Sequence, residues 1–388
     1  MDDREPNEAR LLAKIAMLKA QLKALYTRKL QSLSRKDQLE AKRDTLESEL
    51  VQLKAKLAAL EEDGMDAEIV IVMGYNAAGK STLVQKFVDD GYYRINRDTT
   101  GGTLDGQALL AKKAFKDGNK KIVLDNTYIT IESRESIIAA AKELKTPIRC
   151  VWLATSFEDA QFNACLRMVE RAGKILSPEE LKKSKDPNLF PPIALYGARN
   201  KFEGKDKDLK HPGKQTPTVK EGFSKVEKVE FVRKWPADYT NKAVVLDYDD
   251  TLRTSTGPNP WPEKPEHVKM LPGRTEVLKK YIKDGYRMLG ASNQSAIAKG
   301  LPEEDCVACF EQTNKLLKVD VEYTYCPHRV PPVSCYCRKP APGMLALWIV
   351  KYKLDPSKCI FVGDSTSDKT CAERAGMKYM TPQEFFGQ

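Results

Sequence analysis

Long hydrophobic runs are missing from this chain of 388 residues. No apolar stretch approaches the roughly 18 residues of a membrane-spanning helix, so we expect no association with a membrane. The first ten residues are acidic and contain no apolar core, which argues against a secretory signal and against a mitochondrial transit peptide. We therefore expect an intracellular protein, in the cytoplasm or the nucleus.

Histidine is scarce, with three in the whole chain, and the nine cysteines are an odd number. Three of these cysteines crowd around one of the histidines, and the others are scattered. Disulfide frameworks need paired cysteines and an oxidising compartment, whereas this distribution fits a reducing compartment and a single metal site.

Glycine and proline are absent from residues 8–62. Apolar residues recur there at spacings of three and four, and this heptad pattern predicts a coiled coil. Polar residues interrupt the pattern near its middle, which leaves one rod of about 80 Å or a hairpin turning near Ser34–Asp37. We expect residues 1–63 to be an oligomerisation arm that makes the protein a homo-oligomer; alternatively, the arm lies on the enzyme domains of its own chain. The heptad positions are Leu11, Ile15, Leu18, Leu22, Leu25, Leu39, Leu46, Leu50, Leu53, Leu57 and Leu60.

The charge balance favours anionic partners, since the net charge is +10 and the isoelectric point is about 8.9. After the arm, short apolar strands alternate with amphipathic helices, which predicts an α/β protein with parallel sheets. Two such patterns are visible, and we expect one domain at residues 65–236 and another at 240–388. Residues 178–235 are rich in lysine and proline, which predicts a lid and a linker.

The first domain contains a phosphate-binding loop. The sequence from Gly74 to Ser81 matches G-x-x-x-x-G-K-[ST] and lies between a predicted strand and a predicted helix. Backbone N–H groups of such a loop wrap phosphates, the lysine reaches the β- and γ-phosphates, and the serine hydroxyl binds Mg²⁺. We expect ATP to bind the residues Gly74, Asn76, Ala77, Ala78, Gly79, Lys80, Ser81 and Thr82.

Polar residues downstream of this loop suit a kinase. Asp98 follows a short apolar segment and is a candidate base for an acceptor hydroxyl, although an ion pair or a helix cap would explain it too. Asp125 ends a predicted strand and could hold acceptor or phosphate, or cap a turn. Arg167 and Arg171 lie one helical turn apart and could clamp phosphates or simply face solvent.

Together these segments resemble the kinase domain of polynucleotide kinase/phosphatases, over nearly all of residues 68–233. The resemblance implies that Lys80 and Asp98 serve phosphoryl transfer to a 5′-hydroxyl. It implies supporting roles for Ser81, Asp125, Arg167 and Arg171, with the two arginines aligning loosely. The matching segments are GYNAAGKST, NRDT, VLDNT with Arg134, RCVWL, residues 163–168, and Tyr196 to Glu203 leading to Glu221-Gly-Phe223.

Four motifs follow one another in the second domain. They are Asp247-x-Asp249-x-Thr251, a strand ending in Ser292, Lys339 in an Arg-Lys-Pro step, and Gly363-Asp364 with Asp368. This order resembles haloacid-dehalogenase-type phosphatases. The resemblance makes Asp247 the nucleophile and Asp249 the general acid and base. Ser292 and Lys339 would hold phosphate oxygens, and the predicted Mg²⁺ ligands are Asp247, Asp249, Asp364 and Asp368.

A third feature is a cluster of three cysteines and one histidine just before Lys339. Three thiolates and an imidazole fit a closed tetrahedral Zn²⁺ site, which would be structural because no coordination position is open. The alternative is a set of buried cysteines without metal. The loop resembles that of zinc-binding histidinol-phosphate and heptose-bisphosphate phosphatases of the same superfamily. The predicted ligands are Cys326, His328, Cys335 and Cys337.

The leading hypothesis is a bifunctional enzyme that phosphorylates 5′-hydroxyl ends and removes 3′-phosphates of DNA or RNA, so that a ligase or a repair complex can act next. One alternative is a small-molecule kinase fused to a phosphatase for histidinol phosphate or sugar phosphates. Another is an assembly subunit of a repair or defence complex. The sequence shows no base-reading module that would separate DNA from RNA.

Overall fold

The computed structural model describes residues 7–30, 35–64, 67–329 and 335–387. The chain divides into two compact units, residues 1–66 and residues 67–388. No helix within the described ranges combines the length and the apolar character needed to cross a membrane.

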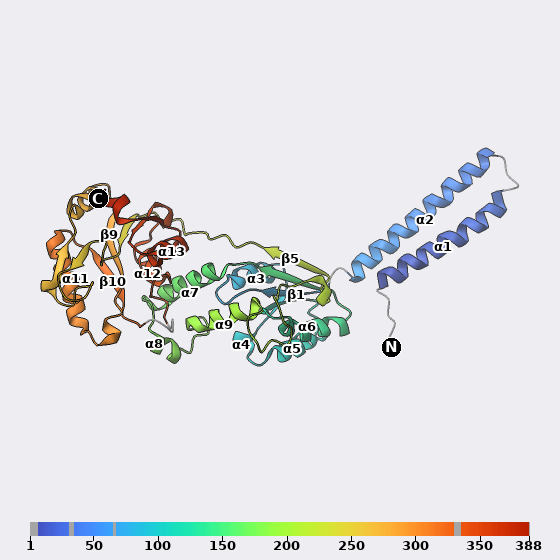
Figure 1. The fold of residues 1–388 in the computed structure, drawn as a ribbon. Helices are drawn as coiled ribbons and strands as arrows, with labels where there is room; N and C mark the ends of the chain where they lie inside the picture. The colour runs from blue at the N-terminus through green and yellow to red at the C-terminus, as the bar shows by residue number, and fades with distance from the viewer. Residues whose placement is uncertain (1–6, 31–34, 65–66, 330–334, 388) are drawn as a thin grey trace. The chain divides into compact units, whose positions relative to one another are not determined.

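The first unit is a helical hairpin. Helices α1 (Asn7–Leu30) and α2 (Arg35–Gly64) lie side by side (Figure 1). They run in opposite directions. The Tyr26 hydroxyl near the end of α1 donates a hydrogen bond of 2.6 Å to the carbonyl of Ala41, which places the end of α1 beside the start of α2. Of the two arrangements that the sequence left open, the chain adopts the hairpin. The connection, residues 31–34, lies outside the described residues.

The second unit begins with a five-stranded parallel sheet in the order β2-β3-β1-β4-β5. The central strand has the sequence EIVIVM and is buried almost throughout, as expected of a parallel strand covered on both faces. Its carboxyl end opens into the phosphate-binding loop. The strands are β1 (Glu68–Met73), β2 (Tyr93–Asn96), β3 (Lys121–Asp125), β4 (Ile148–Leu153) and β5 (Lys225–Val229).

Helices cover both faces of this sheet (Figure 1). Hydroxyl side chains cap several of them; Ser156, for example, accepts a hydrogen bond from the backbone of Asp159 at the start of α7. The helices are α3 (Lys80–Asp89), α4 (Arg97–Thr100), α5 (Leu104–Lys116), α6 (Ile131–Glu143), α7 (Phe157–Ala172), α8 (Pro178–Lys183) and α9 (Pro192–Phe202), with a 3₁₀ turn η1 (Val219–Glu221). Residues 178–235 thus contain two helices and the edge strand β5 in addition to loops.

A second parallel sheet follows, in the order β10-β9-β6-β11-β12. The chain passes from one sheet to the other between β5 and β6, and both sheets belong to the compact unit of residues 67–388, so the boundary expected near residues 236–240 stays a prediction. The strands are β6 (Ala243–Leu246), β9 (Arg287–Asn293), β10 (Glu322–Cys326), β11 (Ile360–Val362) and β12 (Lys378–Met380), with a small antiparallel pair, β7 (Arg253–Ser255) and β8 (Val268–Met270).

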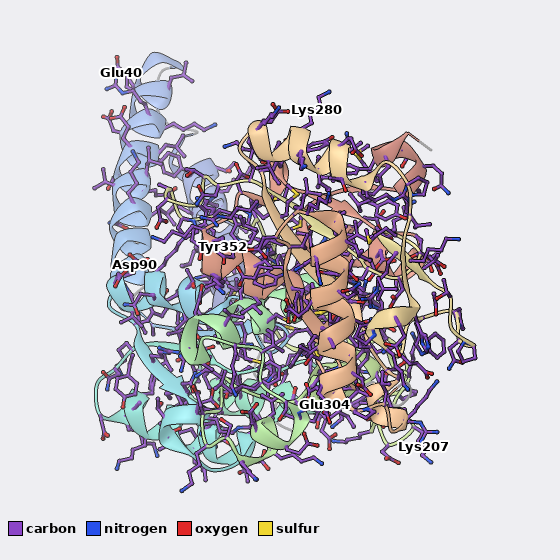
Figure 2. All side chains as sticks on the ribbon, turned by 90° about the vertical axis from the view of Figure 1, so that its left-hand side faces the viewer. Glu40, Asp90, Lys207, Lys280, Glu304 and Tyr352 are labelled. Atoms are coloured by element: carbon purple, nitrogen blue, oxygen red, sulfur yellow. The ribbon has the colours of Figure 1, made fainter. Side chains whose placement is uncertain are left out.

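Helices pack on this sheet as well, and the charged side chains of Lys280 and Glu304 project from them at the surface (Figure 2). The elements are α10 (Arg274–Lys283), α11 (Glu303–Leu317), α12 (Gly343–Tyr352), α13 (Thr366–Ala375) and α14 (Pro382–Phe386), with 3₁₀ turns η2 (Pro265–His267), η3 (Ile297–Lys299) and η4 (Pro356–Lys358). The predicted mixed α/β architecture with parallel sheets is confirmed.

The two sheets are joined by a shared apolar cluster. Helix α7 packs against α12 and α13, and residues from both sides, including Cys165 and Trp348, belong to one buried core. The Arg374 guanidinium also donates a hydrogen bond of 3.2 Å to the side-chain oxygen of Gln161 on α7. The helix that carries Arg167 is therefore braced by the second sheet's domain.

Candidate active sites

The phosphate-binding loop lies between β1 and α3, where the sequence predicted it. Gly79 immediately precedes α3 with a φ of 97°, a left-handed conformation that glycine adopts without steric cost. A Cβ atom on Gly74 would lie 3.0 Å from the carbonyl oxygen of Leu153. Both glycines are thus required by the local backbone, which wraps a cavity of about 90 Å³. The cavity is lined by residues 76–81, Asn96, Arg97, Asp98, Asp125, Asn126, Thr127, Arg167, Pro187, Asn188 and Phe190.

Lys80 lies at the base of this cavity. Its ammonium group donates hydrogen bonds of 3.1 Å and 2.8 Å to the carbonyls of Gly74 and Tyr75. Burial lowers the pKa of Lys80 to about 8, while the carboxylates of Asp125 and Asp98 oppose that shift. An incoming phosphate would place negative charge beside this partly buried cation.

Asp125 is the most buried carboxylate of this site, with 3% of its side chain exposed. It accepts a hydrogen bond of 3.0 Å from the side-chain amide of Asn96 and pairs with Arg94. The Ser81 hydroxyl lies 3.5 Å from the same carboxylate oxygen. A serine oxygen beside a carboxylate suits Mg²⁺, which prefers oxygen ligands in P-loop sites.

Asp98 and Arg167 also face this cavity, whereas Arg171 does not line it. The exposed Asp98 carboxylate stands at its rim, on α4. Arg167 donates a hydrogen bond of 3.0 Å to Asn188 and lies close enough to Lys80 to oppose its protonation. Arg171 instead pairs with Asp186 at 2.6 Å and is half exposed. The structure thus brings one of the two predicted lid arginines to the cavity at the phosphate-binding loop.

A larger cavity of about 630 Å³ lies on the other side of the loop. Thr82 and Lys86 of α3 line it, together with Leu166 of α7 and with Phe231 and Arg233 from the segment after β5. The Arg233 guanidinium lies over the Phe231 ring at 5.1 Å and pairs with Asp159 at 2.8 Å, so this wall is tied to α7. The cavity offers apolar and cationic surface next to the site for phosphates.

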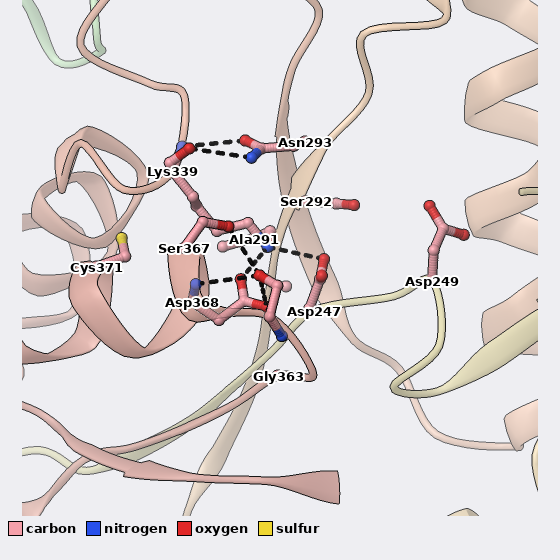
Figure 3. A network of polar contacts seen from close by, with 12 residues as sticks. Asp247, Asp249, Ala291, Ser292, Asn293, Lys339, Gly363, Ser367, Asp368 and Cys371 are labelled. Atoms are coloured by element: carbon pink, nitrogen blue, oxygen red, sulfur yellow. Dashed lines mark hydrogen bonds and ion pairs between the residues drawn. The ribbon is translucent and has the colours of Figure 1, made fainter.

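The second site lies at the carboxyl edge of the second sheet. Asp247 follows β6, while Asp364 and Asp368 come from the loop after β11 and the start of α13. One oxygen from each of these three carboxylates lies within 4.8 Å of the others. Figure 3 shows Lys339 reaching between Asp247 and Asp368, and its ammonium lies 2.8 Å and 2.7 Å from their oxygens.

The electrostatics of this group call for additional positive charge. Burial raises the pKa of Asp247, and the positive charge of Lys339 offsets part of this rise. Burial lowers the pKa of Lys339, but its two carboxylate partners outweigh that effect and raise it. Oxygens of Asp247 and Asp368 are buried without a hydrogen-bond partner of good geometry. Three convergent carboxylates that share a single ammonium, that of Lys339, fit a hard divalent cation such as Mg²⁺.

Asp249 lies outside this carboxylate group, although the sequence named it as a Mg²⁺ ligand. Figure 3 shows Asp249 set apart from Asp247. One oxygen accepts a hydrogen bond of 2.9 Å from Arg253, and the other accepts one of 2.8 Å from Gln294. Gln294 also donates a hydrogen bond of 2.9 Å to Ser292, the predicted phosphate-binding hydroxyl.

The cysteine–histidine cluster is assembled as a candidate metal centre. The ligand atoms of Cys326, His328, Cys335 and Cys337 all lie within 4.8 Å of one another. The sulfurs of Cys326 and Cys335 are 3.7 Å apart. Two sulfurs bound to a tetrahedral zinc at 2.3 Å would lie about 3.8 Å apart, so the spacing fits that metal.

Four residues of these sites were assigned no role from the sequence: Arg94, Asn96, Arg253 and Gln294. Arg94 and Asn96 lie two residues apart on β2, and the period of two that places both on one face of the sheet was the available signal. Arg253 gave no such signal, because its pairing with Asp249 depends on the turn between them.

Comparison with known proteins gives two family matches. Residues 69–174 match the AAA domain, and residues 242–386 match the polynucleotide kinase 3 phosphatase family. The bifunctional polynucleotide phosphatase/kinase of Schizosaccharomyces pombe is 34% identical over 185 residues, which are 47% of this chain and 36% of that protein. This chain therefore spans about a third of the length of that relative.

The chain is also similar to a curated phosphatase and to a chain of a solved structure. The D-glycero-beta-D-manno-heptose-1,7-bisphosphate 7-phosphatase of Haemophilus influenzae is 34% identical over 138 residues, covering 33% of this chain and 73% of that protein. A chain in the structure of the Pnkp1/Rnl/Hen1 RNA repair complex is 15% identical, with a TM-score of 0.26, over 81% of this chain and 95% of that one. The chain thus joins a region that matches the AAA domain to a region that matches the polynucleotide kinase 3 phosphatase family, and part of it is similar to a bifunctional polynucleotide phosphatase/kinase.

Proposed function

We propose that this chain heals nucleic-acid ends, with a kinase that phosphorylates 5′-hydroxyls and a phosphatase that removes 3′-phosphates. The observation that carries the proposal is that one basic chain holds a cavity at a loop of phosphate-binding sequence and, separately, a group of carboxylates around a lysine. One is the cavity around Lys80, and the other is the group of Asp247, Asp368 and Lys339. A nucleic acid with a 5′-hydroxyl at one broken end and a 3′-phosphate at the other would be a substrate for both sites.

In the kinase reaction, Asp98 accepts the proton of the 5′-hydroxyl as that oxygen attacks the γ-phosphorus of ATP. The bond between the γ-phosphorus and the bridging oxygen breaks, and ADP leaves. Lys80 and Arg167 face the phosphates and stabilise the charge that develops on them. The cavity of about 630 Å³ beside the loop would take the nucleoside of ATP.

In the phosphatase reaction, a carboxylate oxygen of Asp247 attacks phosphorus and the bond to the 3′-oxygen breaks. Asp249 gives its proton to that leaving oxygen and later takes a proton from the water that cleaves the aspartyl phosphate. Ser292 and Lys339 hold phosphate oxygens. Mg²⁺, held by Asp247, Asp364 and Asp368, would offset the repulsion between nucleophile and phosphate when bound.

The test is a matched set of oligonucleotides. DNA and RNA strands carrying either a 5′-hydroxyl or a 3′-phosphate are incubated with full-length protein, Mg²⁺ and ATP, and the ends are analysed by mass. We expect a gain of phosphate at the 5′ end and a loss at the 3′ end. A protein that changes neither end on any strand would contradict the proposal, and comparison of DNA with RNA gives the preference.

A second candidate substrate class is a phosphorylated metabolite, such as a sugar phosphate or histidinol phosphate. The similarity to the Haemophilus influenzae phosphatase favours it, since that match covers 73% of the relative. The same preparation is therefore offered heptose and histidinol phosphates in parallel. Faster release of phosphate from a metabolite than from the oligonucleotides would favour a small-molecule enzyme.

The setting and partners follow from these products. A 5′-phosphate and a 3′-hydroxyl are the ends that a ligase joins, so a ligase or a repair complex is the expected partner. The nine cysteines are all free in the structure, which supports an intracellular location in the cytoplasm or the nucleus.

The Zn²⁺ site is part of the proposal as a structural element. Its residues Cys335 and Cys337 lead directly to Lys339, and Tyr336 between them is fully buried in the core cluster that contains Cys165 of α7. A metal bound there would fix both the phosphate-binding lysine and the packing between the two sheets' domains.

We expect removal of this metal to lower the midpoint of thermal unfolding by several degrees and 3′-phosphatase turnover by about tenfold or more. Bound zinc is measured by elemental analysis before and after chelation, and re-addition of Zn²⁺ should restore both properties. The matched variants are Cys335→Ala and Cys150→Ala, two buried cysteines of which only the first should lose the metal. Equal zinc content in both variants would contradict the site.

The arm is proposed to make the protein a homo-oligomer. Leu39, Leu46 and Leu50 line one groove of α2 and remain more than half exposed in the hairpin, whereas Tyr26 and Thr45 are partly buried between its helices. Exposed leucines at heptad spacing are typical of a surface that a further helix covers.

Light scattering of the full-length protein is expected to give a multiple of the chain mass of 43.7 kDa. Replacing Leu46 and Leu50 by glutamate should reduce the mass toward that of one chain, while Gln52→Glu, on the same helix, should leave it unchanged. A monomeric wild type would contradict the proposal. Deletion of residues 1–63 should preserve turnover, which a subunit that works only in an assembly would lose.

A further inference from the structure

Arg253 is a buried cation placed against the proposed general acid. Its side chain is 1% exposed, and its Nε donates a hydrogen bond of 2.9 Å to Asp249. Its terminal nitrogen donates to the carbonyl of Cys309 at 2.7 Å and to the hydroxyl of Thr313 at 2.9 Å. The guanidinium is thus fixed to helix α11 and held in one orientation.

Aromatic packing fixes it further. The guanidinium carbon lies 5.2 Å from the ring centroid of Tyr248 and 4.9 Å from that of Phe310. Both rings are buried, and they contact each other edge to face at 4.5 Å. A charge enclosed in this way is costly to bury unless it is paired, and Asp249 supplies the pairing carboxylate.

Asp249 is held from both sides. Arg253 donates to one of its oxygens, and Gln294 donates to the other while also contacting Ser292. With a donor on each oxygen, the plane of the carboxylate is set rather than free to rotate. Gln294 links that orientation to the hydroxyl that would hold the phosphate.

The place where Asp249 is held matches the geometry of the reaction. Displacement at phosphorus puts the attacking and leaving oxygens in line on opposite sides. A residue that protonates the leaving oxygen must therefore lie across the phosphate from Asp247. Figure 3 shows Asp249 apart from Asp247, on the side away from Lys339.

From these contacts we infer that Arg253 is a positioning residue, which acts through Asp249 to hold the general acid on the leaving-group side of the phosphatase site. The inference rests on the proposed phosphatase chemistry. It predicts that loss of Arg253 harms the expulsion of a leaving group that needs a proton far more than that of one that does not.

The experiment compares two leaving groups in full-length wild type and Arg253→Met. Attack on a nucleoside 3′-phosphate expels the 3′-oxygen of the nucleoside, a basic alkoxide that needs a proton to leave. Attack on p-nitrophenyl phosphate expels p-nitrophenolate, which is stable without one. With the nucleotide, we expect the first turnover to slow by about 100-fold or more. With p-nitrophenyl phosphate, the burst of p-nitrophenol should change by less than about threefold, since that step needs no acid. Equal slowing on both substrates would overturn the inference.

A double variant and a conservative variant complete the test. If Arg253 acts through Asp249, Asp249→Asn with Arg253→Met should be no slower on the nucleotide than Asp249→Asn alone, and an additive loss would overturn the inference. Should Arg253→Met lack a cooperative unfolding transition, Arg253→Lys decides by the same comparison of substrates. A wild type inactive on both phosphates would refute the phosphatase function itself, a result distinct from unselective slowing.

Discussion

Replacing Asp247 by asparagine is expected to abolish 3′-phosphatase activity, with a loss of at least about 10⁴-fold in turnover. An amide cannot form the aspartyl phosphate, and it also removes one of the three carboxylates that converge on the cation site. The 5′-kinase should change by less than about twofold, because its residues come from the other sheet. Release of phosphate from a 3′-phosphate oligonucleotide and transfer of labelled γ-phosphate to a 5′-hydroxyl measure the two activities in one preparation.

The chain offers a matched control three residues away. Asp250 is exposed, and its φ of 57° is in the left-handed region that asparagine tolerates well. We expect Asp250→Asn to keep phosphatase turnover within about threefold of wild type. If both variants lose activity equally, general loss of negative charge would explain the effect; if Asp247→Asn retains turnover, the nucleophile has been misassigned.

Much of the architecture could be predicted because carboxylates and glycines end apolar strands. The strand before Asp247 and the strand before Gly74 were both expected to be buried, and both lie at the centre of a parallel sheet. Parallel strands present their carboxyl ends at one edge, so motifs far apart in the sequence meet there. The sequence for this reason indicated both phosphate sites, and the family matches confirm the fold.

Contacts that depend on loops were not predictable in the same way. Arg253 reaches Asp249 because Asp250 turns the backbone through a left-handed conformation, and the pattern of residue types does not encode that approach. Arg171 shared a helical face with Arg167, yet Asp186 from the following loop pairs with it. Side-chain partners supplied by loops decided both outcomes.

The segment at residues 178–235 differs from its expected character for a related reason. Its lysines and prolines predicted a lid and a linker, but β5 completes the first sheet at its edge. The strand, KVEKV, has three charged residues and two valines and is only partly buried, so it lacks the continuous apolar run of β1. Edge strands in parallel sheets are exposed to solvent along one side, which weakens the pattern on which such predictions depend.

Replacing Lys80 by alanine is expected to lower 5′-kinase turnover by about 10²–10³-fold or more, since it removes a buried cation that faces the phosphates. The lysine now satisfies the carbonyls of Gly74 and Tyr75 within the loop. Burial lowers its pKa to about 8, so a bound polyphosphate would favour its charged form. Because the charged form of Lys80 attracts the phosphates of bound ATP as well as those of the transition state, the affinity for ATP should fall along with turnover.

Labelled phosphate transfer to a 5′-hydroxyl oligonucleotide and calorimetric titration with ATP and Mg²⁺ measure the two effects. The matched control is Lys113→Ala, an exposed lysine on α5 that lines neither cavity beside the loop, and it should behave as wild type. In Lys80→Ala the 3′-phosphatase should persist, mirroring Asp247→Asn. Kinase activity that survives in Lys80→Ala would mean that ATP binds elsewhere. Loss of both activities would mean that the two sites depend on each other. Helix α7 would then connect them, because it packs against helices of the second sheet.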